Sequence, residues 1–80
     1  MKVKVHVTLK EGVLDPQGKA VEHALADLGF GGIEGVRIGR FIEFDIDERD
    51  PDKVRAESDK MCRKLLANTV IENYRIYLEQ

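Results

Sequence analysis

The stretch KVKVHVTLKEGVLDPQGKAV, residues 2–21, joins a strand pattern to the start of a helix. Residues 2–10 alternate apolar with polar side chains, and this period of two is typical of a strand with one buried face. Asp15-Pro16 then supplies an N-cap followed by proline at the first helical position. Apolar residues continue at helical spacing as far as Leu28, and Gly29 follows as a C-cap. The chain is therefore expected to pass from strand to helix here.

The same arrangement returns in the second half of the chain. Asp50-Pro51 repeats the cap and the proline, and predicts a helix that ends near Asn68. Before it, residues 36–47 alternate as one long strand that Gly39 bends, and after it residues 73–78 alternate as a third strand. The order β-α-β-α-β predicts an α+β two-layer sandwich of ferredoxin-like character. In it, an antiparallel sheet carries both helices on one face, and the long bent middle strand serves two sheet positions.

Length and composition indicate one domain that covers residues 1–80. With 42% hydrophobic and 35% charged residues, the chain is too apolar for disorder and too charged for a membrane protein. A net charge of −2 argues against nucleic acid as a partner. Neither a signal peptide nor a membrane-spanning stretch is present, so we expect a cytoplasmic protein with no membrane partner.

The sequence offers little catalytic chemistry. Gly18-Lys19 lacks the spacing and the hydroxyl of a phosphate loop. His6 and His23 are not spaced as metal ligands, and Cys62 lies on the apolar stripe of the second predicted helix with no base nearby. We therefore predict no catalytic, cofactor-binding or metal-binding residue.

Basic residues near the first strand and the middle strand could form a face for an anion. Acidic residues lie between them, which favours a mixed, solvated surface instead. The basic residues are Lys2, Lys4, Lys10, Arg37 and Arg40.

Three blocks of the sequence resemble the PurS family, and the resemblance covers the entire chain. The blocks are residues 7–21, 36–40 and 65–72, and the run Leu14-Asp15-Pro16-Gln17-Gly18 is the most specific part. PurS is the small subunit of phosphoribosylformylglycinamidine synthase, also called formylglycinamide ribonucleotide amidotransferase, in purine biosynthesis.

The resemblance implies a bridging subunit without catalytic residues of its own. A glutaminase subunit, PurQ, would release ammonia from glutamine, and a synthetase subunit, PurL, would use that ammonia with ATP and magnesium. The PurS-like chain would bind no cofactor, form a homodimer or a dimer of dimers, and hold PurQ and PurL together for ammonia transfer.

Five residues are predicted to contact other chains: Gln17, Lys19, Arg37, Arg40 and Phe41. Gln17 and Lys19 follow the helix cap and are left free for a partner. A strand over residues 36–47 would extend roughly 40 Å, so one end should project beyond the sheet. We expect a second copy to pair with that end around Arg40 and Phe41.

The alternative hypothesis is a small-ligand-binding regulatory module of the ACT type. Such a domain carries an aspartate and a glycine between its first strand and first helix, and Asp15-Pro16-Gln17-Gly18 resembles that arrangement imperfectly. A free amino acid that raised the melting temperature of the chain by several degrees would favour this alternative.

Overall fold

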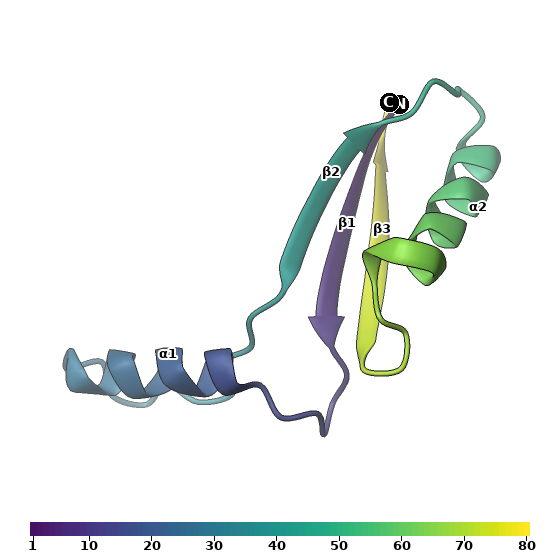
Figure 1. Cartoon of the computed structure of the whole chain (residues 1–80). Helices are drawn as coiled ribbons and strands as arrows, with labels where there is room; N and C mark the ends of the chain where they lie inside the picture. Colours follow the sequence, from purple (N-terminus) through teal and green to yellow (C-terminus); the bar gives the residue numbers. More distant parts are fainter.

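The computed structural model describes all of residues 1–80, and its elements follow in the predicted order (Figure 1). Three antiparallel strands form one sheet in the order β2-β1-β3, so the fold class is α+β as predicted. The elements are β1 (Lys2–Leu9), α1 (Pro16–Asp27), β2 (Arg40–Asp45), α2 (Pro51–Met61), the π-helical turn η1 (Cys62–Leu66) and β3 (Glu72–Glu79).

The core lies between one face of the sheet and α2. Val3, Val5 and Val7 of the central strand β1 are fully buried, because their period of two directs all three to the same face. Val54 of α2 and Cys62 of η1 are the fully buried apolar residues of the helical layer. The helix predicted to continue to Asn68 changes at Cys62 into a π-helical turn, and only the cysteine of that turn is buried.

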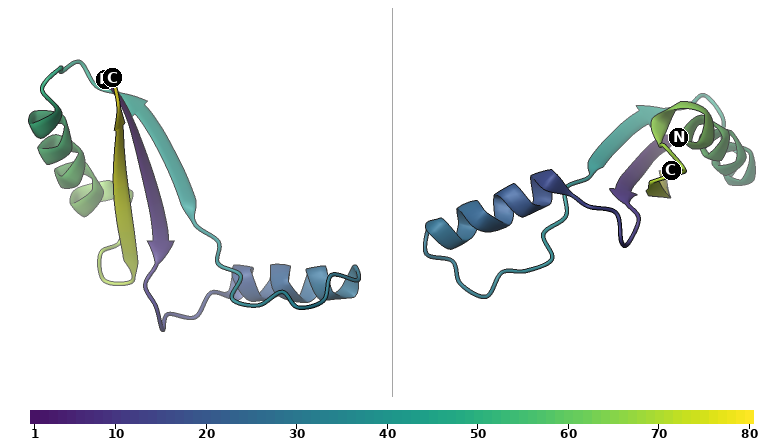
Figure 2. Two further views of the ribbon diagram at one scale, coloured as in Figure 1. Left: turned by 180° about the vertical axis from the view of Figure 1, so that it is seen from behind. Right: turned by 60° about the horizontal axis from the view of Figure 1, so that its bottom comes forward.

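Only one helix covers the sheet, which corrects the prediction that both helices lie on one face. α1 projects from the end of the sheet and lies beside none of the three strands along its length (Figures 1 and 2). Gly18 is its only buried residue. The apolar stripe of α1 was the basis of the prediction, but a stripe does not specify which surface covers it. We call α1 and the segment 28–39 that leads back to the sheet the arm.

The predicted strand 36–47 is wrong in its length. β2 has six residues, and residues 36–39 before it pair with no strand. The amide of Ile38 donates to the side chain of Asp15 rather than to a neighbouring strand. At Gly39 the chain passes so close to β1 that a Cβ would lie 2.5 Å from the Val7 carbonyl oxygen. The bend was predicted at Gly39, and β2 begins directly after that residue. Residues 36–39, the part of the predicted strand that lies outside the sheet, belong to the arm.

The two ends of the chain lie side by side at the end of the sheet remote from the arm (Figure 1). Lys2 of β1 is paired with Glu79 of β3, and the terminal amino group of Met1 donates to the Ile46 carbonyl at 2.9 Å. No helix combines the length and the apolar character needed to cross a membrane.

The arm gives the chain an elongated shape. Its radius of gyration is 16.0 Å, whereas a compact domain of this length is expected to have about 12 Å. Only 9 of 80 residues are buried, and these lie in β1, in α2, in η1 and the residue after it, Ala67, and at the base of the arm. The distal arm therefore contributes surface without contributing to the core.

Candidate subunit interface

The side chain of Asp15 fixes the base of the arm, by which we mean the place where α1 begins and the returning segment 36–39 passes beside it. One carboxylate oxygen accepts from the Gly18 amide and the other from the Ile38 amide, both at 2.8 Å. The first bond caps α1, and the second ties the returning segment to the start of the helix. Asp15 is only 6% exposed. The hydrogen bonds from Ile38 and then from Gly18 lower the pKa of the Asp15 carboxyl below its ordinary value.

Two further contacts hold the same base. Gly18 lies so close to the returning segment that a Cβ would be 2.2 Å from the Val36 carbonyl oxygen, so only glycine fits there. The guanidinium of Arg37 donates to the carbonyl oxygens of Val13 and Lys10, each at 3.1 Å. The arm therefore leaves the sheet in a defined direction.

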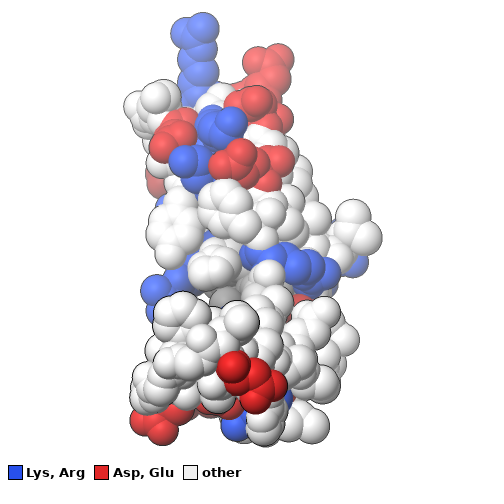
Figure 3. Space-filling model, turned by 90° about the vertical axis from the view of Figure 1, so that its left-hand side faces the viewer, with Lys and Arg blue, Asp and Glu red and all other residues white.

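Beyond its base, the arm exposes large apolar side chains. Leu28 is 74% and Phe30 58% exposed. The arm points towards the viewer in the lower part of Figure 3, where most of the surface carries no charge. Several exposed apolar side chains on one projecting element make this surface a candidate for contact with another macromolecule. The exposed apolar residues of the arm and its base are Leu14, Val21, Leu28, Phe30, Ile33 and Ile38.

The five predicted interface residues fall into two neighbouring groups. Gln17, Lys19 and Arg37 belong to the arm, and Gln17 and Lys19 are exposed on the first turns of α1. Lys19 lies 3.3 Å from the carboxylate of Glu22, and Arg37 makes the base contacts described above.

Arg40 and Phe41 form the second group, at the start of β2. The Arg40 guanidinium donates to the Leu66 carbonyl at 3.0 Å and to the Glu72 carboxylate at 2.8 Å, so it is engaged within the chain. Phe41 is 58% exposed, and its ring forms an edge-to-face pair with the ring of His6, at a centroid distance of 6.4 Å.

Sequence reasoning missed the apolar side chains of the distal arm. Leu28, Phe30 and Ile33 stand in or beside the glycine-rich segment 29–35, whose glycines by themselves predict only a loop. Large apolar residues interspersed among those glycines were the signal that this loop carries exposed apolar surface.

Cys62 lies in the core, as predicted. It is fully buried, and desolvation, followed by the nearby Asp59 carboxylate, raises the pKa of its thiol. A raised pKa disfavours the thiolate, which is the nucleophilic form of cysteine, and the buried side chain packs in the core.

Replacing Asp15 by asparagine is expected to destabilise the chain at pH 7 and to have less effect in acid. A carboxyl whose pKa is lowered by folding stabilises the folded state above its unfolded pKa, and this stabilisation is lost as the pH falls through the folded pKa. Urea unfolding of both proteins between pH 7 and pH 2 measures the difference. Asp27→Asn is the control, because Asp27 is exposed and has no hydrogen-bond partner for its side chain. A loss that stayed constant with pH would contradict this role of Asp15.

Comparison with known proteins identifies the family. Residues 2–80 match the PurS family model, described as phosphoribosylformylglycinamidine (FGAM) synthase. The PurS subunit of Bacillus subtilis phosphoribosylformylglycinamidine synthase is 52% identical over 79 residues, which cover 99% of this chain and 93% of that protein.

Two solved structures share the fold. PurS of Methanocaldococcus jannaschii, one of the subunits of formylglycinamide ribonucleotide amidotransferase in the purine biosynthetic pathway, is 40% identical with a TM-score of 0.89, and the match covers 99% of this chain and 95% of that one. A chain in the structure of PurLQS from Thermotoga maritima is 26% identical with a TM-score of 0.86, covering 95% and 93% of the two chains. The full-length matches and the shared fold lead to one conclusion: the chain belongs to the PurS family of phosphoribosylformylglycinamidine synthase subunits in purine biosynthesis.

Proposed function

We propose that this chain is the bridging subunit that holds the glutaminase PurQ and the ATP-dependent synthetase PurL together, so that ammonia passes between their active sites. The observation that carries this proposal is the arm, an apolar extension that the chain's own sheet does not cover. A chain similar to this one occurs in the PurLQS structure. Holding two active sites in register contributes to rate by positioning, and requires no catalytic group from the bridging chain.

The exposed area supports a homodimer as the bridging unit. The chain exposes 6015 Å², whereas a compact monomer of 9.1 kDa is expected to expose about 4,900 Å². The excess of about 1,100 Å² exceeds the roughly 800 Å² that each partner contributes to a standard interface. A second copy with an identical arm would cover this surface through a twofold arrangement.

The sheet offers a place for the partner's arm. α2 packs mainly against β3, and the apolar residues on the same face near β2 remain only half-buried. These residues are Ile42, Phe44 and Ile46. In the proposed dimer, the arm of one copy lies on this part of the other copy's sheet, beside α2. Each half of the dimer then carries two helices on one sheet face, which is the arrangement predicted for the single chain.

We also propose that the five predicted interface residues contact other chains. Arg37, Arg40 and Phe41 lie at the base of the arm and at the start of β2, where the two copies would meet. Gln17 and Lys19 are exposed for PurQ or PurL. ATP, magnesium and glutamine are used by those two subunits. The ACT-type alternative gains no support from Asp15, because both of its carboxylate oxygens already accept backbone hydrogen bonds.

Reconstitution with PurQ and PurL tests the bridging function. Without this chain, PurL is expected to keep its activity with an ammonium salt but to lose most of the activity driven by glutamine. Adding the chain should restore the glutamine-driven activity. Equal glutamine-driven turnover with and without the chain would contradict the proposal.

A single variant locates the contact more finely. Gln17→Ala is expected to leave the melting temperature unchanged, because Gln17 is exposed and its side chain forms no hydrogen bond within the chain. It should weaken co-elution with PurQ and PurL in size-exclusion runs. Normal assembly would remove Gln17 from the proposed interface.

A further inference from the structure

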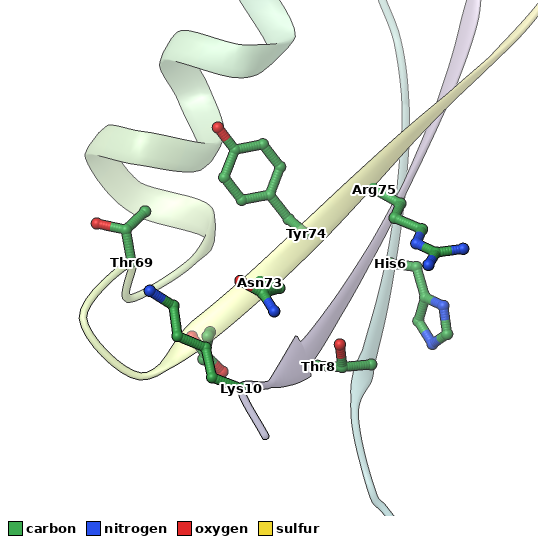
Figure 4. A pocket seen from close by; sticks show the side chains of 8 residues that line it. His6, Thr8, Lys10, Thr69, Asn73, Tyr74 and Arg75 are labelled. Carbon is green, nitrogen blue, oxygen red and sulfur yellow. The ribbon is translucent and has the colours of Figure 1, made fainter. Parts of the chain in front are cut away.

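A polar groove of about 600 Å³ lies where β1 ends and β3 begins, away from the distal arm. Figure 4 shows His6 and Arg75 side by side at one side of the groove, Lys10 near Thr69 at the other, and Thr8 and Asn73 between them. The hydroxyl of Tyr74 is turned away and donates to Asp59 of α2. A volume of this size suits a small molecule, since ligand pockets typically enclose about 300–1,000 Å³.

The groove carries positive charge that the chain itself does not neutralise. Neither Arg75 nor Lys10 has a carboxylate within ion-pair distance. Glu72 is the only acidic residue in the lining, and it already accepts from the Arg40 guanidinium at 2.8 Å and from the Asn68 amide at 2.7 Å. Two cations without partners therefore face the groove in a chain whose net charge is −2.

The strand register brings the donors together. His6 and Arg75 are directly paired across β1 and β3, and Thr8 is paired with Asn73. Residues that alternate along a strand point to the same face, so these four side chains stand on the sheet face opposite α2. A guanidinium presents paired N–H donors that match the oxygens of a phosphate group, and hydroxyl and amide donors add hydrogen bonds to it.

We propose that this groove binds a small phosphate ester. The phosphate lies against Arg75 and His6, and the polar remainder of the molecule extends along Thr8 and Asn73 towards Lys10. The site shares no residue with the five proposed contacts of the subunit interface, so it goes beyond the bridging function and can be tested without PurQ or PurL.

Titration of the full chain with ribose 5-phosphate, followed by ¹⁵N–¹H NMR at low salt, tests this site. We expect saturable shifts of the amides of His6, Thr8 and Arg75. Ribose should give no shifts, and inorganic phosphate should bind more weakly than the ester. Arg75→Gln should weaken ribose 5-phosphate binding at least tenfold while the remainder of the spectrum stays native.

Arg49→Gln is the matched control. Arg49 is also an exposed arginine without an ion pair, but it lies with Met1 and Gln80 at the opposite end of the sheet. Its replacement should leave the affinity unchanged. The proposal is overturned if shifts do not saturate, if inorganic phosphate binds as tightly as the ester, or if Arg49→Gln weakens binding as much as Arg75→Gln does.

Discussion

Replacing Gly18 by alanine is expected to detach the returning segment from α1 and to destabilise the arm by about 1–3 kcal/mol. The added Cβ would lie 2.2 Å from the Val36 carbonyl oxygen and 3.0 Å from the carboxylate of Asp15. The nearest atom is backbone, so no side-chain rotation relieves the clash. Any shift of Val36 also strains the bond from the Ile38 amide to Asp15. Hydrogen exchange of the Ile38 amide measures this loss directly.

Gly31→Ala is the matched control for this substitution. Gly31 also belongs to the arm, but a Cβ there would have no heavy atom within 4 Å, and its backbone does not adopt a positive φ. Its replacement should change stability by no more than about 0.5 kcal/mol. If the Ile38 amide exchanged equally fast in both variants, the close contact at Gly18 would not stabilise the arm.

Replacing Leu28 by aspartate is expected to convert the proposed homodimer into a folded monomer. Leu28 is 74% exposed in the single chain, and the proposed dimer buries it against a second copy, where an unpaired carboxylate is costly. The dissociation constant should rise on the order of 100-fold, which corresponds to about 2.7 kcal/mol. Sedimentation equilibrium measures this change, and circular dichroism verifies that the chain remains folded.

Two further variants define the interface. Leu65→Asp introduces the same change at a leucine that is 82% exposed on η1, outside the arm, and it should leave the dimer intact. Phe41→Asp tests the separate prediction that a second copy also contacts the start of β2: Phe41 is paired with His6 and faces away from α2, so a monomer in this variant would extend the interface to the other face of the sheet. An unchanged dimer in Leu28→Asp would show that the arm does not form the interface.

The sequence predicted the local elements because their signals are local. The valines of β1 alternate without interruption, and Asp15-Pro16 and Asp50-Pro51 start both helices at the predicted residues. Both aspartates accept hydrogen bonds from the first turn, as N-caps do. These features depend only on residues within one turn or one strand.

The position of α1 could not be predicted in the same way. Its apolar stripe shows that one face is to be covered, but periodicity does not distinguish the chain's own sheet from that of another copy. The second hydrogen bond of Asp15 joins residues 23 positions apart, and no local pattern signals it. The shortening of the predicted strand follows from that same bond, because it draws residues 36–39 towards the helix. The polar groove could not be predicted either, because the register of β1 and β3 decides which of their side chains come together.

The neighbouring ends of the chain permit a change in connectivity. Because β1 and β3 bring residues 2 and 79 into register, a short peptide could join the two termini, and new ends could be opened among the exposed glycines at 29–35 without cutting a strand. Because the two termini are close together, a protein fused to either one would be attached at the same end of the sheet, opposite the arm. This domain could therefore be inserted into a loop of a larger polypeptide while the arm remained uncovered.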